Sequence, residues 1–319
     1  MSFGSSKWQE WVLDEHEAIP VIDHAYKSGI NTWDTADVYS FGQSEEIIGK
    51  ALRQLHIPRE RVVILSKCYF GLKEPGQKFD ISSLFTNDGE LVNRVGLSRK
   101  HIFDAVEASV KRLGTYIDVL QIHRLDRATP REEIMRALND VIDKGWVRYI
   151  GASSMAAWEF QQLQNIADKH GWHKFISMQN YYNLIYREEE REMIPYCQNA
   201  GIGLVPWSPM AGGVLARPWT ERNTKREETD KLVKDLSRDR SLKSDEDIVN
   251  RVEELANQKK VSMAEISIAW HLSKGTNPVL GLSKIERIDD AVAALKVELS
   301  EDEIRYLEEP YLPKRVQGY

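Results

Sequence analysis

Four side chains that can take part in proton transfer follow apolar segments of the chain. Asp34 and Tyr39 lie in NTWDTADVYS, Lys67 ends RVVILSK, and His123 ends YIDVLQIH. A phenol with an ordinary pKa of about 10 is a poor acid near neutrality, but a neighbouring ammonium makes its proton easier to donate. A carboxylate keeps that ammonium charged, and an imidazole can hold a carbonyl oxygen or pass a proton. Together these groups are suited to protonating a carbonyl oxygen while a nicotinamide or flavin supplies hydride.

Each of these residues also has a common structural role. A lysine at the end of a strand is more often at the rim of the core, and a histidine such as His123 is more often a hydrogen-bonded structural residue. Asp37, in the same stretch as Asp34, can simply cap a turn. The functional interpretation therefore depends on an acid, a phenol, an amine and an imidazole occurring together at three successive strand ends.

Helical and extended segments alternate along the chain and determine where these side chains lie. Several of the helical patterns end on glycine, and they are predicted over residues 17–29, 44–55, 98–114, 130–145, 155–171, 189–201, 246–260, 263–275 and 285–296. Ser44 and Ser98 look like helix N-caps. The extended segments between the helices are GINTWD, RVVILSK, YIDVLQIH, VRYIGAS, KFISMQN, IGLVPW and NPVLGL.

This alternation indicates parallel βαβ units. Seven strands follow residue 29, and the opening MSFG can be the tail of an eighth. We therefore predict a (β/α)8 TIM barrel that forms a single domain over residues 1–319. The alternative is a doubly wound open sheet, but no G-x-G-x-x-G motif opens a helix. Two long segments, 69–97 and 212–245, follow strands and would lie on the carboxyl-terminal face of a barrel, where active sites are found.

Composition argues against several classes of partner. The net charge is −6, and the basic and acidic residues are interspersed, so we expect no binding to nucleic acid or to an anionic membrane. The two cysteines, Cys68 and Cys197, imply no disulfide framework and fit a reducing compartment. No apolar run is long enough to span a membrane and the chain opens on no signal-peptide pattern, so we expect a cytoplasmic protein. The histidines of HGWH have no evident third ligand, so no metal site is predicted.

Motifs of one family run through nearly the whole chain in the family's order. They are INTWDTADVYSFGQSEEIIGKAL, RVVILSKC, SVKRLGTYIDVLQIHRLD, GWVRYIGASS, QNYYNLIYREEE, GLVPWSPMAGGVLA and NPVLGLSKIERIDDAVAAL. With them the chain resembles the aldo-keto reductases, in particular the fungal branch of aryl-alcohol dehydrogenase-like and versiconal hemiacetal acetate reductase-like proteins. The resemblance implies a catalytic tetrad. Tyr39 would be the general acid and Lys67 would lower its pKa, while Asp34 would pair with Lys67 and His123 would orient the carbonyl.

The resemblance also implies the cofactor NADP(H), without a metal, and direct hydride transfer from the nicotinamide to a small-molecule carbonyl. Ser153 and Gln179 would hold the carboxamide, and Trp207 would stack on the nicotinamide ring. Lys284 and Arg287, near a helix N-terminus, would hold the adenosine phosphate and favour NADP over NAD. The full set of matching cofactor positions is Ser153, Ser154, Gln179, Trp207, Ser208, Met210, Gly212, Leu215, Gly281, Ser283, Lys284 and Arg287.

The substrate pocket is predicted from the aromatic residues that directly follow Lys67. Tyr69 and Phe70 would line it, and they indicate an aryl or polyketide-like carbonyl substrate.

The chain departs from the family pattern in three places. Ser154 stands where the family usually has asparagine, and Asp290 and Ala291 stand where glutamate and asparagine usually hold the adenine. The N-terminal hairpin and most of the first strand that the family carries before MSFG are missing, which predicts lower stability. The alternatives to a reductase are therefore a cofactor-binding regulatory subunit, similar to potassium-channel β subunits, or a truncated pseudoenzyme of the same fold. Multiple turnover on a simple aldehyde distinguishes an enzyme from both.

Overall fold

The computed structural model describes residues 1–73, 84, 86–221, 229 and 242–318. Parts of the two long segments at 69–97 and 212–245 therefore lie outside the described residues. The chain forms two compact units, Met1–Met178 and Gln179–Gly318, and each is described by itself.

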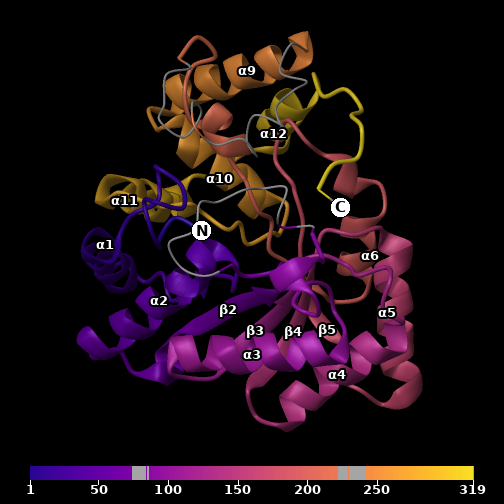
Figure 1. Cartoon of the computed structure of the whole chain (residues 1–319). Coiled ribbons are helices and arrows are strands. Elements are labelled where there is room, and N and C mark those ends of the chain that lie inside the picture. Colours follow the sequence, from indigo (N-terminus) through magenta and orange to yellow (C-terminus); the bar gives the residue numbers. More distant parts are fainter. Residues whose placement is uncertain (74–83, 85, 222–228, 230–241, 319) are drawn as a thin grey trace. The chain divides into compact units, whose positions relative to one another are not determined.

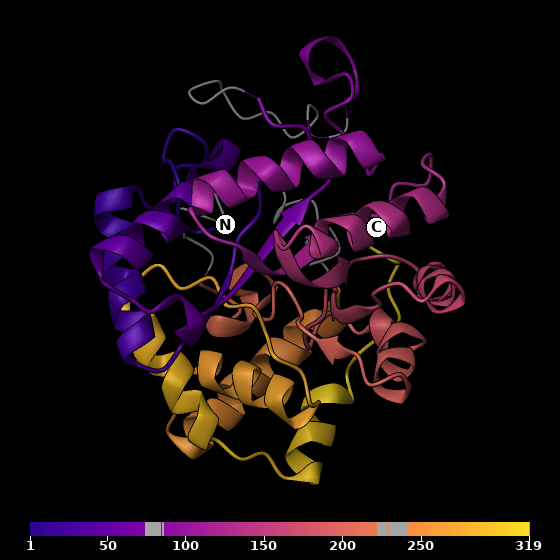
Figure 2. The same ribbon diagram turned by 90° about the horizontal axis from the view of Figure 1, so that it is seen from below.

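The first unit repeats a strand followed by a helix. Its strands are β1 (Thr32–Asp34), β2 (Val63–Cys68), β3 (Ile117–Ile122), β4 (Val147–Ser153) and β5 (Phe175–Gln179, whose last residue begins the second unit). Its helices are α1 (Glu15–Lys27), α2 (Gln43–Gln54), α3 (Arg99–Leu113), α4 (Arg131–Asp143) and α5 (Ala157–His170). Successive helices pack against one another, and α3 and α4 cover one side of the strands (Figures 1 and 2).

Strands β1 to β5 lie in sheet order, and the pairs from β1 to β4 are parallel. Asp34 lies opposite Leu65, and Lys67 lies opposite Gln121. Five of the six residues of β2 and five of the six of β3 are buried, as expected for a parallel sheet covered on both faces. Because parallel strands end at the same edge, the side chains that follow them are brought to one edge of the sheet.

Helix α3 begins and ends as the sequence predicts. The hydroxyl of Ser98 accepts a hydrogen bond from the His101 N–H, which caps the first turn. Gly114 ends the helix with a left-handed φ of 69°.

The predicted N-cap role of Ser44 is wrong. Helix α2 begins at Gln43, after Gly42 in a left-handed conformation, so Ser44 lies inside the first turn. Its buried hydroxyl accepts a hydrogen bond from Thr35 at 2.9 Å, which fixes it to the end of β1 instead. Tertiary packing has therefore taken precedence over the local capping preference.

The second unit is mostly helical. It contains β6 (Gly203–Leu204) and helices α6 (Met193–Asn199), α9 (Lys243–Lys259), α10 (Met263–Ser273), α11 (Ile285–Ala293) and α12 (Glu301–Glu308). Helix α10 packs against α9 and α11, and its buried Trp270 donates a hydrogen bond to Glu308 of α12 at 2.8 Å. Among the α-helices in the described residues of this unit, α12 is the one that the sequence pattern did not predict.

The predicted strand NPVLGL is not a regular strand. The N–H groups of Asn277 and Val279 bond to the carbonyls of Leu204 and Pro206 at 2.9 and 2.8 Å, as a parallel neighbour would. Pro278, between them, has no N–H to donate on the other side, so the run does not extend into a ladder.

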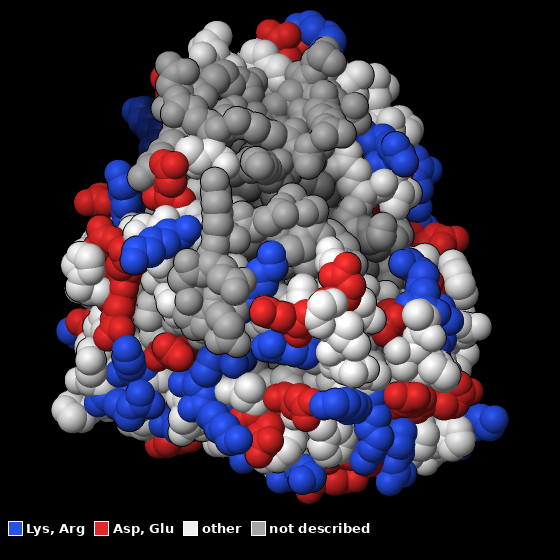
Figure 3. Space-filling view, viewed as in Figure 1, with Lys and Arg blue, Asp and Glu red and all other residues white. Residues whose placement is uncertain are grey.

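The α/β fold is confirmed, with six strands in the described residues rather than the eight of the predicted barrel. The opening MSFG forms no strand, since Phe3 makes only an isolated bridge to Leu13. The closed barrel and the missing N-terminal strand stay predictions. On the face shown in Figure 3, acidic and basic side chains are intermixed. None of the helices in the described ranges is long and apolar enough to cross a membrane.

Candidate active site

The Lys67 ammonium is the centre of a hydrogen-bonded group at the carboxyl ends of β1 and β2. Its Nζ donates to Asp34 Oδ2 at 2.6 Å, to the Thr35 carbonyl at 2.8 Å and to the Tyr39 hydroxyl at 3.3 Å. Three acceptors match the three N–H groups of an ammonium. The Lys67 side chain has no exposed surface, so its direction is fixed by these contacts. The structure thus brings together Asp34, Lys67 and Tyr39.

The pKa values of Lys67 and Tyr39 are both raised in this group. Burial alone would lower the pKa of Lys67, but Asp34 and Tyr39 outweigh it and raise the pKa above its ordinary 10.5. Burial raises the pKa of the Tyr39 phenol above 10.0, while the Lys67 charge acts in the opposite direction. Lys67 therefore acts on Tyr39 as expected, but desolvation is the larger effect. Near neutrality the amine is charged and the phenol is protonated.

Tyr39 lies at the start of a tight left-handed turn, Tyr39–Gly42. Ser40 and Phe41 have φ values of 51° and 55°, which cost free energy for residues with a side chain. Packing compensates, because Phe41 is buried in a cluster with Trp8 and Val12. The Ser40 hydroxyl also accepts a hydrogen bond from the Ser5 N–H at 3.0 Å. The N-terminal residues therefore hold the turn that carries the phenol.

His123 follows β3 and faces the same group. Its ring lies edge-on to Tyr39, with centroids 5.8 Å apart, and edge-on to Phe70 at 4.9 Å. Burial, followed by the Lys67 charge, holds the pKa of His123 well below 6.5, so the imidazole is neutral. Its buried Nδ1 has no hydrogen-bond partner among the described residues. A neutral imidazole is suited to holding a carbonyl oxygen rather than to donating a proton outright.

A second buried group lies beside the tetrad. Glu45 is fully buried and accepts hydrogen bonds from Ser66 and, at 2.7 Å, from Arg112. Asp37 is also fully buried, but neither of its carboxylate oxygens makes a hydrogen bond of good geometry in the part of the chain that is described. Burial, and next the Glu45 charge, raise the pKa of Asp37 well above 3.8. Asp37 is therefore a desolvated acid with no direct contact to the Lys67 ammonium.

Two residues on or directly after β3 adjoin the tetrad although the sequence analysis did not single them out. The amide of Gln121 donates to Asp34 Oδ1 at 3.2 Å. The Arg124 guanidinium donates to the His123 carbonyl at 2.6 Å, and its charge helps to lower the pKa of His123. The period of two in a strand places Gln121 on the same face as His123, which could have identified it. Arg124 carried no such signal.

The first two predicted cofactor residues lie at the end of β4. Ser153 and Ser154 are each 1% exposed, so two buried hydroxyls lie at the carboxyl end of β4, the strand next to β3. Ser154 has a left-handed φ of 41°. Asparagine adopts this conformation more readily than serine, which gives a physical reason for the family's usual residue there.

In the second unit, Trp207 is held flat by neighbouring rings. It stacks on Tyr181 with centroids 4.5 Å apart and planes 24° apart, and Tyr181 stacks in turn on Tyr186. Gln179, at the end of β5, is buried. A fixed indole and a buried amide are groups that fit a nicotinamide ring and its carboxamide.

The predicted pyrophosphate loop is anchored at both ends. The Ser208 carbonyl accepts a hydrogen bond from Asn183 at 3.0 Å, and the carbonyl of the buried Leu215 accepts one from Ser267 at 3.0 Å. Between them, Gly212 has a left-handed φ of 69°. The backbone of this loop is therefore fixed in a turn that favours glycine.

The loop also meets the last predicted cofactor segment. Met210 packs with Leu280 and Leu282 against a cluster that contains Ala291. Ala291, which stands where the family pattern usually has asparagine, is therefore part of the apolar core. Met210 and the segment around Gly281 are brought together within the second unit.

The start of α11 carries the predicted phosphate-binding residues. Gly281, Lys284 and Arg287 are exposed, and Ser283 is half-buried. Arg287 lies 3.4 Å from the Ser283 hydroxyl. In the described ranges, neither Lys284 nor Arg287 forms an ion pair. Two uncommitted cations at a helix N-terminus fit a bound phosphate.

The two predicted substrate-pocket residues differ in exposure. Tyr69 is half-buried, and the ring of Phe70 lies edge-on to it at 5.1 Å. Phe70 is 5% exposed, packs with Ala36 and Val38, and lies edge-on to His123. Tyr69 is therefore the more accessible of the two, and Phe70 supports the imidazole from the side.

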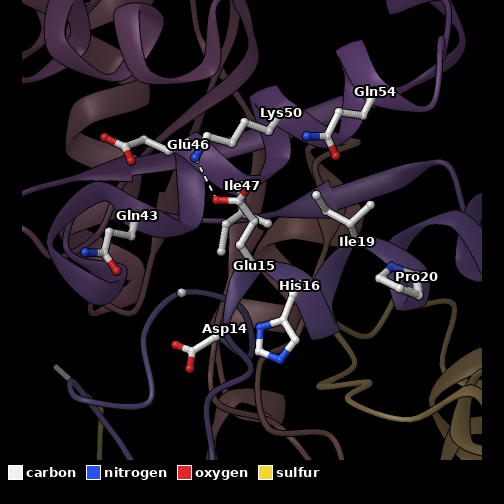
Figure 4. Close-up of a pocket in the computed structure, with 11 residues that line it drawn as sticks. Asp14, Glu15, His16, Ile19, Pro20, Gln43, Glu46, Ile47, Lys50 and Gln54 are labelled. Atoms are coloured by element: carbon white, nitrogen blue, oxygen red, sulfur yellow. Dashed lines mark hydrogen bonds and ion pairs between the residues drawn. The ribbon is translucent and has the colours of Figure 1, made fainter.

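A hollow lies beside α1 and α2 (Figure 4). Polar residues line it, including Asp14, His16 and Glu46. Its lysine, Lys50, is paired with Glu15 at 2.6 Å. No member of the tetrad lines this hollow, so it is not part of the candidate active site.

Comparison with known proteins gives a consistent result. A family model described as the aldo/keto reductase family matches residues 1–311. The versiconal hemiacetal acetate reductase of Aspergillus parasiticus is 63% identical over 318 residues, which cover 99% of this chain and 93% of that protein. Putative aryl-alcohol dehydrogenases of Schizosaccharomyces pombe and Saccharomyces cerevisiae are 56% and 53% identical, each over at least 99% of this chain and 92% of their own length.

Proposed function

The chain belongs to the aldo/keto reductase family, as its sequence motifs predicted, and we propose that it catalyses the NADPH-dependent reduction of aldehyde or ketone carbonyls to alcohols. Its relatives are oxidoreductases. The observation that carries the proposal is the chain of hydrogen bonds from Asp34 through Lys67 to Tyr39.

The tetrad would supply the proton and orient the substrate. His123 would hold the carbonyl oxygen beside Tyr39, whose ring lies 5.8 Å from the imidazole between centroids. As negative charge develops on that oxygen, Tyr39 would donate its proton to it. Lys67 would stabilise the phenolate left behind, because its Nζ already donates to the phenol oxygen. Asp34 keeps Lys67 charged and directed toward Tyr39.

NADPH, when bound, supplies the hydride that completes the alcohol. Ser153 and Gln179 would hold the carboxamide, Trp207 would fix the ring plane, and Ser154 would be a further hydrogen-bonding group for the cofactor. The loop residues Ser208, Met210, Gly212 and Leu215 would follow the pyrophosphate. The adenosine phosphate would lie by Gly281, Ser283, Lys284 and Arg287, which favours NADP over NAD.

An aryl or polyketide-like carbonyl is the proposed substrate class. Tyr69 and Phe70 supply aromatic surface beside His123. The relative at 63% identity is named for a hemiacetal acetate substrate, and two others are named as putative aryl-alcohol dehydrogenases. We also propose a single barrel domain in a reducing, cytoplasmic setting, in which the buried thiols of Cys68 and Cys197 stay free.

Multiple turnover on an aromatic aldehyde tests this function. Purified protein is incubated with 4-nitrobenzaldehyde and excess NADPH, and the alcohol formed is counted against the enzyme present. We expect many equivalents of alcohol, one for each NADPH oxidised, and slower turnover with NADH. NADPH binding without alcohol formation would instead support the regulatory or pseudoenzyme alternative. Absence of both binding and turnover in folded protein would contradict the proposal.

A further inference from the structure

Gln121 is a fully buried polar residue near the carboxyl end of the largely apolar strand β3. In the parallel register it lies directly opposite Lys67 on β2. It also precedes His123 by two residues, so both side chains point to the same face of the sheet. An amide buried among apolar residues is costly unless its polar atoms are hydrogen-bonded.

The Gln121 amide and the Lys67 ammonium bind different oxygens of the Asp34 carboxylate. Gln121 Nε2 donates to Asp34 Oδ1 at 3.2 Å, and Lys67 Nζ donates to Asp34 Oδ2 at 2.6 Å. A carboxylate held by one donor can rotate about its terminal torsion, which has only broad preferences. A carboxylate held at both oxygens by donors from two different strands has a fixed plane.

The neighbouring strand leaves room for this contact. Gly151 of β4 lies opposite Gln121. A Cβ at position 151 would lie 3.1 Å from Gln121 Cγ and 2.5 Å from Ser177 Oγ. A residue with a side chain at position 151 would therefore clash with Ser177 and press on the glutamine side chain beside Asp34.

We propose that Gln121 is a positioning residue that fixes the Asp34 carboxylate, and through it directs the Lys67 ammonium at Tyr39. This inference rests on the proposed reductase function for its catalytic consequence. Without the amide, Asp34 Oδ1 loses its donor from β3, so the plane of the carboxylate is less firmly fixed and the Lys67 ammonium shifts with it. The N–H that Lys67 gives to Tyr39 is the longest of its three contacts and is lost first.

Two substitutions of similar size separate hydrogen bonding from packing. Gln121→Met removes the donor, and we expect kcat to fall about 10- to 100-fold at every pH, because a hydrogen bond to a charged group is lost. The KM values for aldehyde and NADPH should change less than about twofold, since the proposed role of Gln121 acts through Asp34. Gln121→Glu places an ionised carboxylate against Asp34 at neutral and alkaline pH. As the pH falls, the introduced carboxyl takes a proton and can donate again, so kcat relative to wild type should recover.

Thermal stability tests the contact without any need for turnover. Burial and the Asp34 charge should raise the pKa of the introduced glutamate in the folded protein above its value in the unfolded chain. The folded state then binds more protons, so the melting temperature of Gln121→Glu relative to wild type should rise as the pH is lowered. Gln121→Met should show a constant difference from wild type over the same range.

The possible outcomes distinguish a failure of the positioning role of Gln121 from a failure of the proposed reductase function. A melting-temperature difference for Gln121→Glu that does not depend on pH would overturn the positioning role, whether or not the protein is a reductase. So would wild-type kcat in Gln121→Met, or a Gln121→Glu profile parallel to that of Gln121→Met. If the wild-type protein does not turn over but the melting-temperature difference of Gln121→Glu depends on pH, the contact between Gln121 and Asp34 is retained and the reductase function is refuted. If Gln121→Met does not fold, the pH dependence of Gln121→Glu alone decides the matter.

Discussion

Two sets of basic residues, one in each unit, differ in how exposed they are and in how many hydrogen bonds they make. Lys67 in the first unit has no exposed side-chain surface and donates to three acceptors. Lys284 and Arg287 in the second unit are exposed, and the contact that Arg287 makes to Ser283 is 3.4 Å long. The first cation is fixed by its contacts within the protein, whereas the other two form no ion pair with any described residue and stay available to a bound anion. A preorganised charge suits catalysis, and an uncommitted charge suits binding.

The comparison predicts the largest loss of rate at the buried cation. In Lys67→Met, the Tyr39 phenol keeps its burial but loses the ammonium that favours its phenolate. We expect kcat for aldehyde reduction to fall about 1,000-fold, within the usual range for acid catalysis and electrostatic stabilisation. The measurement is steady-state turnover with saturating NADPH. A loss of less than about tenfold in a variant with native circular dichroism would show that the buried cation does not assist the proton transfer.

The exposed cations should affect binding instead of rate. In Lys284→Ala combined with Arg287→Ala, we expect NADPH to bind roughly 10- to 100-fold more weakly, with little change in kcat at saturation or in NADH affinity. The difference should shrink at high salt because exposed charges are screened. Fluorescence titration with both nucleotides measures the effect. Lys296→Ala, at another exposed lysine of the same unit, is the matched control. Equal losses for NADPH and NADH would contradict a phosphate site at α11.

A third prediction concerns the buried acid Asp37, which we expect to affect the stability of the folded protein rather than its activity. Its folded-state pKa is raised by burial and then by Glu45, so the folded protein binds a proton that the unfolded chain releases. Asp37 therefore costs stability as the pH rises above the ordinary value of 3.8. Asp37→Asn should melt higher than wild type at neutral pH, by about 2 °C or more, and the gain should disappear in acid.

Melting curves across pH check this prediction. The control is Asp104→Asn, because that carboxylate is exposed and paired with Lys100 on the surface of α3. A gain in Asp37→Asn that is independent of pH would show that Asp37 is already ionised in the folded protein.

The smallest effect is expected at Ser154. Its left-handed φ of 41° is more easily adopted by asparagine, and the side chain is buried at the end of β4. Ser154→Asn should raise the melting temperature by at most about 1–2 °C if the larger amide fits, and NADPH binding should be at least as tight. Calorimetry and a nucleotide titration test both points. A fall in melting temperature of several degrees would indicate that the surroundings of Ser154 have no room for the larger side chain.

The sequence predicted the parts of this molecule that follow from local pattern and strand order. Parallel strands end at one edge, so Asp34 and Lys67 could be placed together from the strands that precede them. The tight turn at Ser40 and Phe41 could not be predicted, because it depends on packing by the N-terminal residues. The role of Ser44 was misjudged for the same reason, since its hydroxyl is used by Thr35 and not by its own helix.

The remaining differences also come from long-range structure. The expected strand at 277–282 contains Pro278 and does not form a regular ladder, although its neighbours hydrogen-bond as strand residues do. The raised pKa of Asp37 depends on its burial and on the Glu45 charge, which Arg112 opposes, and both of these residues lie on other elements. Charge and periodicity in one segment carry no information on such neighbours.

The most direct test of the central claim is turnover by Tyr39→Phe beside Tyr26→Phe. Both changes remove one phenol oxygen from the first unit, but only Tyr39 accepts a hydrogen bond from Lys67, while Tyr26 packs edge-on against Trp33. With 4-nitrobenzaldehyde and saturating NADPH, we predict at least a ~1,000-fold loss of kcat for Tyr39→Phe and wild-type turnover for Tyr26→Phe. Retention of substantial turnover by folded Tyr39→Phe would contradict the assignment of Tyr39 as the proton donor.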